Sequence, residues 1–336
     1  MPDDERLEKL VFYLATGEDY SAGRVHMVSV WGTRLTSVGL VNEGAPTGMA
    51  FHKGKDGGGV VVAIPRDKGR IMRIAYDGKA STELAAAQGL PHPLDVAIGG
   101  NSDDTYVVDD IANSLGSFKS GPWEPDLRLQ PLLPGFSGRS PMGNDRHLSV
   151  AVTSDKHVIA AGEMGVYRDP SRPESKPLLP KFGGVAADPL SAVWAAAQPP
   201  DLIYVYNGEQ LVKKLSLPSG MAHYRDGRLA FSNDDGWLCV ACQQVNGEAD
   251  DGIQLYLCDD IEKEHYELLF SWGPKYWAHN EMANIVSTDK NINDFVVGPW
   301  LRWPGAPPPS GAKSGKSLRQ KMLDDVNTPA PKSKTP

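Results

Sequence analysis

Four stretches of the chain gather the polar residues best suited to chemistry, and each directly precedes a short apolar run. They contain histidine, asparagine and charged side chains, namely His92 and Asp95; Asn144, Asp145 and His147; His223 and Arg225; and His279, Asn280 and Glu281. Neutral imidazoles with carboxylates suit zinc, whereas amide and carboxylate oxygens suit calcium or magnesium. One divalent ion bound by His223, His279 and Glu281 would be able to polarise a carbonyl or activate a water molecule.

These residues admit three interpretations. In a catalytic interpretation, His147 or His223 acts as the base, and Glu281 acts as a second base or a metal ligand. In a binding interpretation, six polar residues contact a ligand: His92, Asp95, Asn144, Asp145, Arg225 and Asn280. In a structural interpretation, all of these side chains cap loops, satisfy backbone groups and hold water. The residue types alone leave the three interpretations open.

Other motifs point away from chemistry. Cys239 and Cys242 have the spacing of a metal-binding pair, but side chains three residues apart on a strand point to opposite faces. With Cys258 they are therefore predicted to be buried thiols. The glycine-rich residues 54–59 lack the Gly-Lys-Ser/Thr end of a phosphate-binding loop and are predicted to form a hairpin. The Gly-x-Ser-x-Gly motif of hydrolases does not occur.

The elements that must position the polar residues are strands. Short runs rich in Val, Ile, Tyr, Phe and Trp recur between clusters of Gly, Pro, Asn and Asp, and amphipathic helix patterns are almost absent. An apolar–alanine triplet recurs along the chain, and a turn and a second strand follow each copy. The copies are Met49-Ala50-Phe51, Val96-Ala97-Ile98, Val150-Ala151-Val152, Val185-Ala186-Ala187, Leu229-Ala230-Phe231 and Met282-Ala283-Asn284. Four strands per repeat of about 40 to 50 residues predict the blades of an all-β propeller.

Six triplets predict six blades, and a further match at Met221-Ala222-His223 leaves seven as the alternative. The first 41 residues supply three strands without an innermost one, whereas the Met282 repeat supplies an innermost strand without outer ones. The two ends of the chain are therefore predicted to close the ring by sharing a blade. Residues 294–300 are then one strand too many. Residues 1–303 are predicted to form the propeller, and residues 304–336 a disordered, basic tail rich in Pro and Lys.

One blade carries a family resemblance. Residues 90–98, Leu-Pro-His-Pro-Leu-Asp-Val-Ala-Ile, continue through residues 103–110 to Asn113 and Phe118 in a pattern that resembles an NHL repeat. That family is similar in blade layout to the senescence-marker-protein and gluconolactonase group. The resemblance implies a central channel whose ligand-facing end is built by the loops that lead into the innermost strands. Gluconolactonase-like members hold a divalent cation there through Glu, Asn and Asp. The Glu-Gly-Pro pattern of their first blade is absent here, where Met49 stands, and this departure weakens the hydrolase interpretation.

Charge and composition narrow the classes of partner. The formal net charge is −8, which disfavours nucleic acid and anionic membranes. The tail carries six basic side chains against two acidic ones and is available to an acidic partner. A secretory signal and an apolar run of about 18 residues are both absent, and three cysteines suit reduced thiols, so a cytoplasmic location is predicted.

Together these features predict a binding or interaction propeller that presents its channel face to a small molecule or a protein partner. The alternative is a hydrolase or lyase, similar to a lactonase or esterase, that uses one divalent ion (calcium, magnesium or zinc) at the channel mouth.

Overall fold

The computed structural model describes most of the chain between residues 10 and 306. The described ranges are 10–17, 23–30, 32, 34–40, 44–52, 58–65, 69–85, 89–99, 104–119, 127–134, 136, 138–139, 146–180, 183–225, 227–232, 236–246, 253–272 and 292–306, with the backbone alone at 82–85, 138–139 and 146–147. Every regular element in these ranges is a β-strand. No helix in the described part of the chain could cross a membrane.

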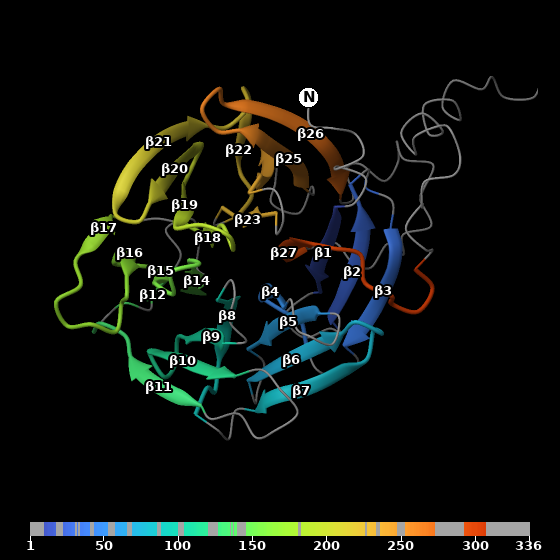
Figure 1. Cartoon of the computed structure of the whole chain (residues 1–336), viewed down its shortest axis with the longest axis horizontal. Helices are drawn as coiled ribbons and strands as arrows, with labels where there is room; N and C mark the ends of the chain where they lie inside the picture. The colour runs from blue at the N-terminus through green and yellow to red at the C-terminus, as the bar shows by residue number, and fades with distance from the viewer. Residues whose placement is uncertain are drawn as a thin grey trace, which may run out of the picture.

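Six antiparallel sheets surround a common centre, as the sequence predicts for a six-bladed propeller (Figure 1). Blade 1 combines both ends of the chain: β27 (Ile292–Gly298), β1 (Val11–Thr16), β2 (Gly23–Ser29) and β3 (Arg34–Leu40). Blade 2 contains β4 (Gly48–His52), β5 (Gly59–Ile64), β6 (Arg70–Ala75) and β7 (Ala80–Ala85). Blade 3 contains β8 (Pro93–Ile98), β9 (Asp104–Asp109), β10 (Ser114–Lys119) and β11 (Arg128–Pro131).

The remaining blades follow in chain order after a short pair, β12 (Gly138–Arg139) and β13 (Arg146–His147). Blade 4 contains β14 (Ser149–Val152), β15 (Val158–Gly162), β16 (Gly165–Arg168) and β17 (Pro177–Leu179). Blade 5 contains β18 (Val185–Ala187), β19 (Val193–Gln198), β20 (Leu202–Asn207) and β21 (Gln210–Ser216). Blade 6 contains β22 (Met221–His223), β23 (Leu229–Phe231), β24 (Leu238–Gln244), β25 (Ile253–Asp260) and β26 (His265–Trp272).

Blade 6 resolves the six-or-seven alternative. The Met221 triplet forms β22, which pairs with β24 through His223 and Cys242. The Leu229 triplet forms β23, which pairs with the same strand through Leu229 and Val240. Two apolar triplets thus share one sheet, and the described chain forms six blades.

The closing strand differs from the predicted one. The three N-terminal strands of blade 1 were predicted, but their inner partner is β27, which pairs with β1 from Val11↔Gly298 to Thr16↔Ile292. The supposed surplus strand at residues 294–300 is therefore the one that closes the ring. Its triplet, Phe295-Val296-Val297, has valine where the other blades have alanine, and a search for alanine passes over it. The triplet at residues 282–284, which was predicted for this role, lies outside the described residues.

The apolar core lies in the seams between neighbouring blades. Alternate side chains of each inner strand enter the seams on opposite sides, as the pleat of a strand requires. In blade 3, Val96 packs in the seam with blade 2, whereas Ala97 packs in the seam with blade 4. In blade 5, Val185 and Ala186 divide in the same way. A single blade therefore cannot bury both of its faces without both neighbours.

The segment after β27 reinforces the closure. Trp303 is buried in the seam between blades 1 and 2, where its Nε1 donates to the carbonyl of Ala75 (3.0 Å). Its ring meets that of Tyr13 edge-on at 5.2 Å, and the Tyr13 hydroxyl donates to the carbonyl of Pro299 (2.7 Å). The chain is thus pinned across both blades that border this seam.

Candidate functional site: the central channel

A channel of about 450 Å³ lies between the inner strands of all six blades. Figure 1 shows these strands, β4, β8, β14, β18, β23 and β27, around the centre of the molecule. We call the end at which the inner strands begin the leading end, and the other the trailing end. Apolar side chains line the trailing end, including Phe51, Ile98 and Phe231.

The leading end is formed by the residue that directly precedes the apolar triplet in each blade. These six residues, the inner ring, are Gly48, Asp95, Ser149, Gly184, Arg228 and Asp294. All but Gly48 line the channel. Because the residues occupy one level of the six inner strands, they bring polar groups from distant parts of the sequence to one end of the channel.

Three inner-ring side chains bind the next blade. The backbone amide of Met49 donates to Asp294 Oδ2 (2.7 Å), and that of Val150 donates to Asp95 Oδ2 (2.9 Å). In the same geometry, the amide of Val185 donates to Ser149 Oγ (3.2 Å). Each bond joins the inner ring of one blade to the first triplet residue of the next. These side chains therefore hold neighbouring inner strands in register.

Two inner-ring positions require glycine because backbones approach there. A Cβ on Gly48 would clash with the backbone of Leu94 and Asp95 and with the Asp95 carboxyl group. A Cβ on Gly184 would clash with the carbonyl of Gly227 in blade 6. At these two positions the adjacent chain itself fills the space that a side chain would take.

Arg228 is the exception in the inner ring. A guanidinium has no acceptor for a backbone amide, so Arg228 cannot repeat the contact made by Asp294, Asp95 and Ser149. Its Nη1 lies 3.8 Å from Asp294 Oδ1 in blade 1, and its Nη2 donates to the carbonyl of Thr47 (3.3 Å), directly before blade 2. The side chain thus extends past blade 1 across the leading end.

The two carboxyl groups are electrostatically unusual. Burial raises the pKa of Asp95 and that of Asp294, and the Arg228 guanidinium opposes both shifts. For Asp294 the result is a pKa of about 7, to which repulsion from Asp95 contributes. The channel lining at the leading end therefore contains one guanidinium and two carboxyl groups among the described residues, and near neutral pH a proton is readily gained or lost there.

Of the predicted site residues, Asp95 belongs to the inner ring, whereas Arg225 lies near the leading end without lining the channel. Arg225 Nη1 donates to Asn293 Oδ1 (3.1 Å), directly beside Asp294 in the chain. Asn293 in turn donates from Nδ2 to the carbonyls of Gly17 (3.1 Å) and Pro46 (3.0 Å). Arg225 is therefore connected to the channel through the residue that anchors the start of β27.

His92 is held away from the inner ring. Its backbone amide donates to Asp109 Oδ2 (2.6 Å), and its Nδ1 lies 2.6 Å from Asp110 Oδ1. Asp109 also accepts from the amide of Ala112 (2.8 Å), and burial raises its pKa. These contacts fix the turn between β9 and β10.

His223 lies in the seam between blades 5 and 6. Its Nε2 donates to the carbonyl of Leu202 (2.7 Å), since a carbonyl can only accept. Burial lowers the pKa of His223 to about 4, so the imidazole is neutral. The His223 side chain is therefore hydrogen-bonded to the backbone of blade 5.

The other predicted site residues are not placed. Asn144, Asp145, His279, Asn280 and Glu281 lie outside the described residues, and only the backbone of His147 is described, in β13. Within the described ranges no three His, Cys, Asp or Glu side chains gather as metal ligands would. The roles assigned to these residues stay predictions.

Sequence reasoning missed Ser149, Arg228 and Asp294. A usable signal was present, because each directly precedes an apolar triplet, the position that Asp95 occupies in blade 3. Asp294 was harder to find because its strand had not been assigned to a blade.

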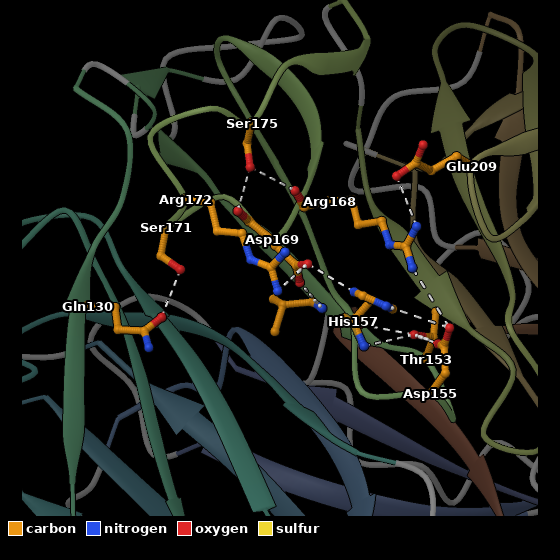
Figure 2. Close-up of polar contacts among 11 residues, drawn as sticks. Gln130, Thr153, Asp155, His157, Arg168, Asp169, Ser171, Arg172, Ser175 and Glu209 are labelled. Atoms are coloured by element: carbon orange, nitrogen blue, oxygen red, sulfur yellow. Dashed lines mark hydrogen bonds and ion pairs between the residues drawn. The ribbon is translucent and has the colours of Figure 1, made fainter.

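A second polar cluster lies on blade 4 and reaches blade 5 through Glu209 (Figure 2); none of its members lines the channel. This His157 network consists of Thr153, Asp155, His157, Arg168, Asp169, Arg172 and Glu209. His157 Nδ1 lies 2.9 Å from Asp169 Oδ2, and Arg168 Nη1 lies 3.0 Å from Glu209 Oε1. A hydrogen bond from Thr153 (2.5 Å) is the main cause of a lowered pKa at Asp155. The charged side chains of the network form ion pairs with one another at the surface.

The cysteine prediction is confirmed. Cys239, Cys242 and Cys258 are free and buried. Cys239 packs in the seam between blades 6 and 1, and Cys242 in the seam between blades 5 and 6, on the opposite face. Burial raises the pKa of Cys242 to about 12, which keeps the thiol protonated.

Solved structures of similar overall fold are known, although no sequence relative is found. No protein-family model matches the chain, and no curated protein sequence matches it. A crystal structure of a nidogen/laminin complex is similar with a TM-score of 0.56 and 10% identity, covering 86% of this chain and 98% of that one. A protein from Lactobacillus plantarum has a TM-score of 0.50 and 15% identity, with 78% and 82% covered. A putative 6-phosphogluconolactonase from Bacteroides fragilis has a TM-score of 0.49 and 13% identity, with 79% and 82% covered. At such identities these likenesses concern the fold alone, and the six sheets described above establish a six-bladed β-propeller.

Proposed function

We propose that the chain is a binding protein that takes a small molecule into its central channel. The observation that carries this proposal is Arg228, whose charged side chain lines the leading end of the channel, 3.8 Å from Asp294 and hydrogen-bonded to the carbonyl of Thr47. A volume of about 450 Å³ falls within the range of about 300–1,000 Å³ that is common for small-molecule sites. A few convergent polar groups in an otherwise apolar cavity are also typical of such sites.

The trailing end supports the same proposal. Leu190, on the turn between β18 and β19, lines the channel and is 53% exposed. Phe51 and Phe231 line the channel on the inner strands of blades 2 and 6. An apolar wall with an exposed apolar residue at its rim suits a ligand with an apolar part.

The test fills the channel without disturbing the inner ring. Ala187 is half-buried and lines the trailing end, so Ala187→Trp should occupy part of the cavity. Ala80 is exposed on the outermost strand of blade 2, and Ala80→Trp is the matched control. Small molecules that bind the wild-type protein, found by ligand-observed NMR on a fragment library, should lose affinity for Ala187→Trp and keep it for Ala80→Trp. Ligands that bind both variants equally would refute a channel site.

The metal-dependent hydrolase or lyase remains an alternative prediction. Its proposed ligands His279 and Glu281 lie outside the described residues, and His223 contacts Leu202. The NHL and gluconolactonase resemblance, an acidic partner for the tail and the cytoplasmic location likewise remain predictions. None of the described contacts favours the metal-dependent reaction over a binding function.

A further inference from the structure

The charges that line the channel are unbalanced. Among the described residues that line it, Asp95, Asp294 and Arg228 are the charged ones, and all three lie at the leading end. When both carboxyl groups are ionised, one guanidinium leaves one excess negative charge in this lining, because Arg225, which donates to Asn293, does not line the channel. Burying an uncompensated charge is costly, so a positive group brought by a ligand would be stabilised there.

We propose that the channel binds an organic monocation with a compact apolar body, its charged group beside Asp95 and Asp294 and its body toward Phe51 and Phe231. This inference rests on the proposed function, because it names the class of molecule that the channel takes. The charged end and the apolar end of the channel are separated along the inner strands, since the inner-ring residue precedes the apolar triplet in every blade.

Arg228 leaves room for such a group. Its Nη1 lies 3.8 Å from Asp294 Oδ1, whereas charge-assisted hydrogen bonds of this type are typically about 2.7–2.9 Å long. It also donates to the carbonyl of Thr47 (3.3 Å). One guanidinium balances one negative charge, so the two carboxylates together can still balance a bound cation.

The donor set favours an organic cation over a divalent metal ion. The inner ring supplies two carboxyl groups, and each already accepts a backbone amide of the next blade. Calcium takes about six to eight oxygen ligands, and structural zinc takes four ligands. In the described ranges no third carboxylate, histidine or cysteine joins Asp95 and Asp294 in a metal-binding group. An ammonium group needs only a few acceptors, which this end of the channel can supply.

Without a bound cation, a proton can neutralise one of the two carboxylates. The pKa of Asp294 is about 7, so this carboxyl group is partly protonated at neutral pH. A bound cation would favour the ionised form of Asp294, and the proton would leave to solvent. Binding near pH 7 should therefore release protons.

The experiment compares three probes that share one ring and differ in charge: cyclohexylmethylammonium, cyclohexylmethanol and cyclohexanecarboxylate. Isothermal titration calorimetry on the full chain measures their affinities at about pH 7 in two buffers of different ionisation enthalpy. We expect the ammonium to bind at least tenfold more tightly than the other two, with an enthalpy that depends on the buffer in the direction of proton release. The wild-type protein alone supplies this part of the test.

A variant pair assigns the effect to the channel. Asp294→Asn should weaken ammonium binding at least tenfold and remove the buffer dependence. Asp155→Asn, which removes a carboxylate of the surface His157 network, should leave binding unchanged. Thermal melts establish that both variants are folded.

The outcomes separate this inference from the proposed function. Equal affinity for the ammonium and the alcohol would overturn the charge preference and leave the channel as a binding site. Tighter binding of the carboxylate would overturn it as well, and would assign the selectivity to Arg228. No binding by any of the three probes would count against both proposals.

Discussion

The inner ring and the His157 network both combine aspartate with arginine but differ in their access to water. Asp95 and Asp294 are buried at the centre of the propeller, whereas Asp155 and Glu209 in the network have side chains that are 46% and 68% exposed. Burial raises the pKa of the two inner-ring carboxyl groups, whereas a hydrogen bond lowers that of Asp155. Environment rather than residue type therefore decides which cluster can take up a proton near neutral pH.

The two regions also use hydrogen bonds differently. The inner-ring carboxylates accept backbone amides that have no contact with bulk water, so loss of a carboxylate leaves buried donors unpaired. The network is held largely by hydrogen bonds and ion pairs between side chains that are at least partly exposed, and water can take the place of either partner when one is lost. We therefore expect substitutions in the inner ring to cost more stability than matched substitutions in the network.

Asp95→Ala should have the largest effect. It removes the acceptor of the Val96 amide (2.8 Å) and the Val150 amide (2.9 Å), both buried. Unpaired buried donors and a lost partner of a buried cation predict a loss of about 3 kcal/mol in the free energy of unfolding. Urea denaturation measures it, with Asp155→Ala as the surface control, expected to lose less than about 1 kcal/mol. Equal losses in the two variants would remove the proposed difference between the regions.

Asp294→Asn should change the pH dependence of stability. A folded-state pKa of about 7, raised from the ordinary value near 3.8, means that the folded protein binds more protons than the unfolded chain between these values. The wild type should therefore lose stability as pH rises from about 4 to 7, by roughly 1–2 kcal/mol after allowance for coupling to Asp95.

Asparagine does not titrate, so Asp294→Asn should not show this loss. As pH rises from about 4 to 7, the free energy of unfolding of the variant should therefore increase relative to that of the wild type. Urea denaturation at several pH values measures that difference. A difference that stays constant with pH would show that Asp294 keeps an ordinary pKa in the folded protein.

Most of the fold was predictable because its signal is local and repeated. The alanine triplets marked five of the six inner strands, because small side chains recur where the inner strands crowd around the centre. The sixth inner strand was missed because valine stands in its triplet, at Val296. The choice between six and seven blades could not be made from the triplets either, since β22 and β23 share one sheet.

The candidate site was less predictable than the fold. Asp95 was found because it lies beside His92 in a stretch that looks chemical. Arg228 was missed because its importance depends on how far its side chain extends past blade 1, and this is a property of the assembled ring. His157 was passed over for a similar reason: its partner Asp169 lies 12 residues away, and the pairing of β15 with β16 brings the two side chains together.

Asp169 is the most constrained residue of the His157 network. Its Oδ1 accepts the Val158 amide (3.1 Å), its Oδ2 faces His157, and its backbone has a positive φ of 51°. Asp169→Ala should cost about 1–2 kcal/mol, because it loses these contacts and alanine tolerates this backbone poorly. Asp169→Asn keeps an acceptor and suits the left-handed region, so it should lose clearly less. Similar losses in both variants would assign the cost to the charge instead.

The ion pair between Arg168 and Glu209 should have the smallest effect. It joins blades 4 and 5 at 3.0 Å, but Glu209 is mostly exposed, so ordering two long side chains offsets much of the attraction. A double-mutant cycle of Arg168→Ala and Glu209→Ala should give a coupling energy below about 1 kcal/mol, and about 1 M salt should reduce it further. Buried charges are screened much less, so the cost of Asp95→Ala should change little in the same salt. A coupling energy above about 2 kcal/mol that resists salt would mean that the surface network behaves like the inner ring, and that exposure alone does not separate the two regions.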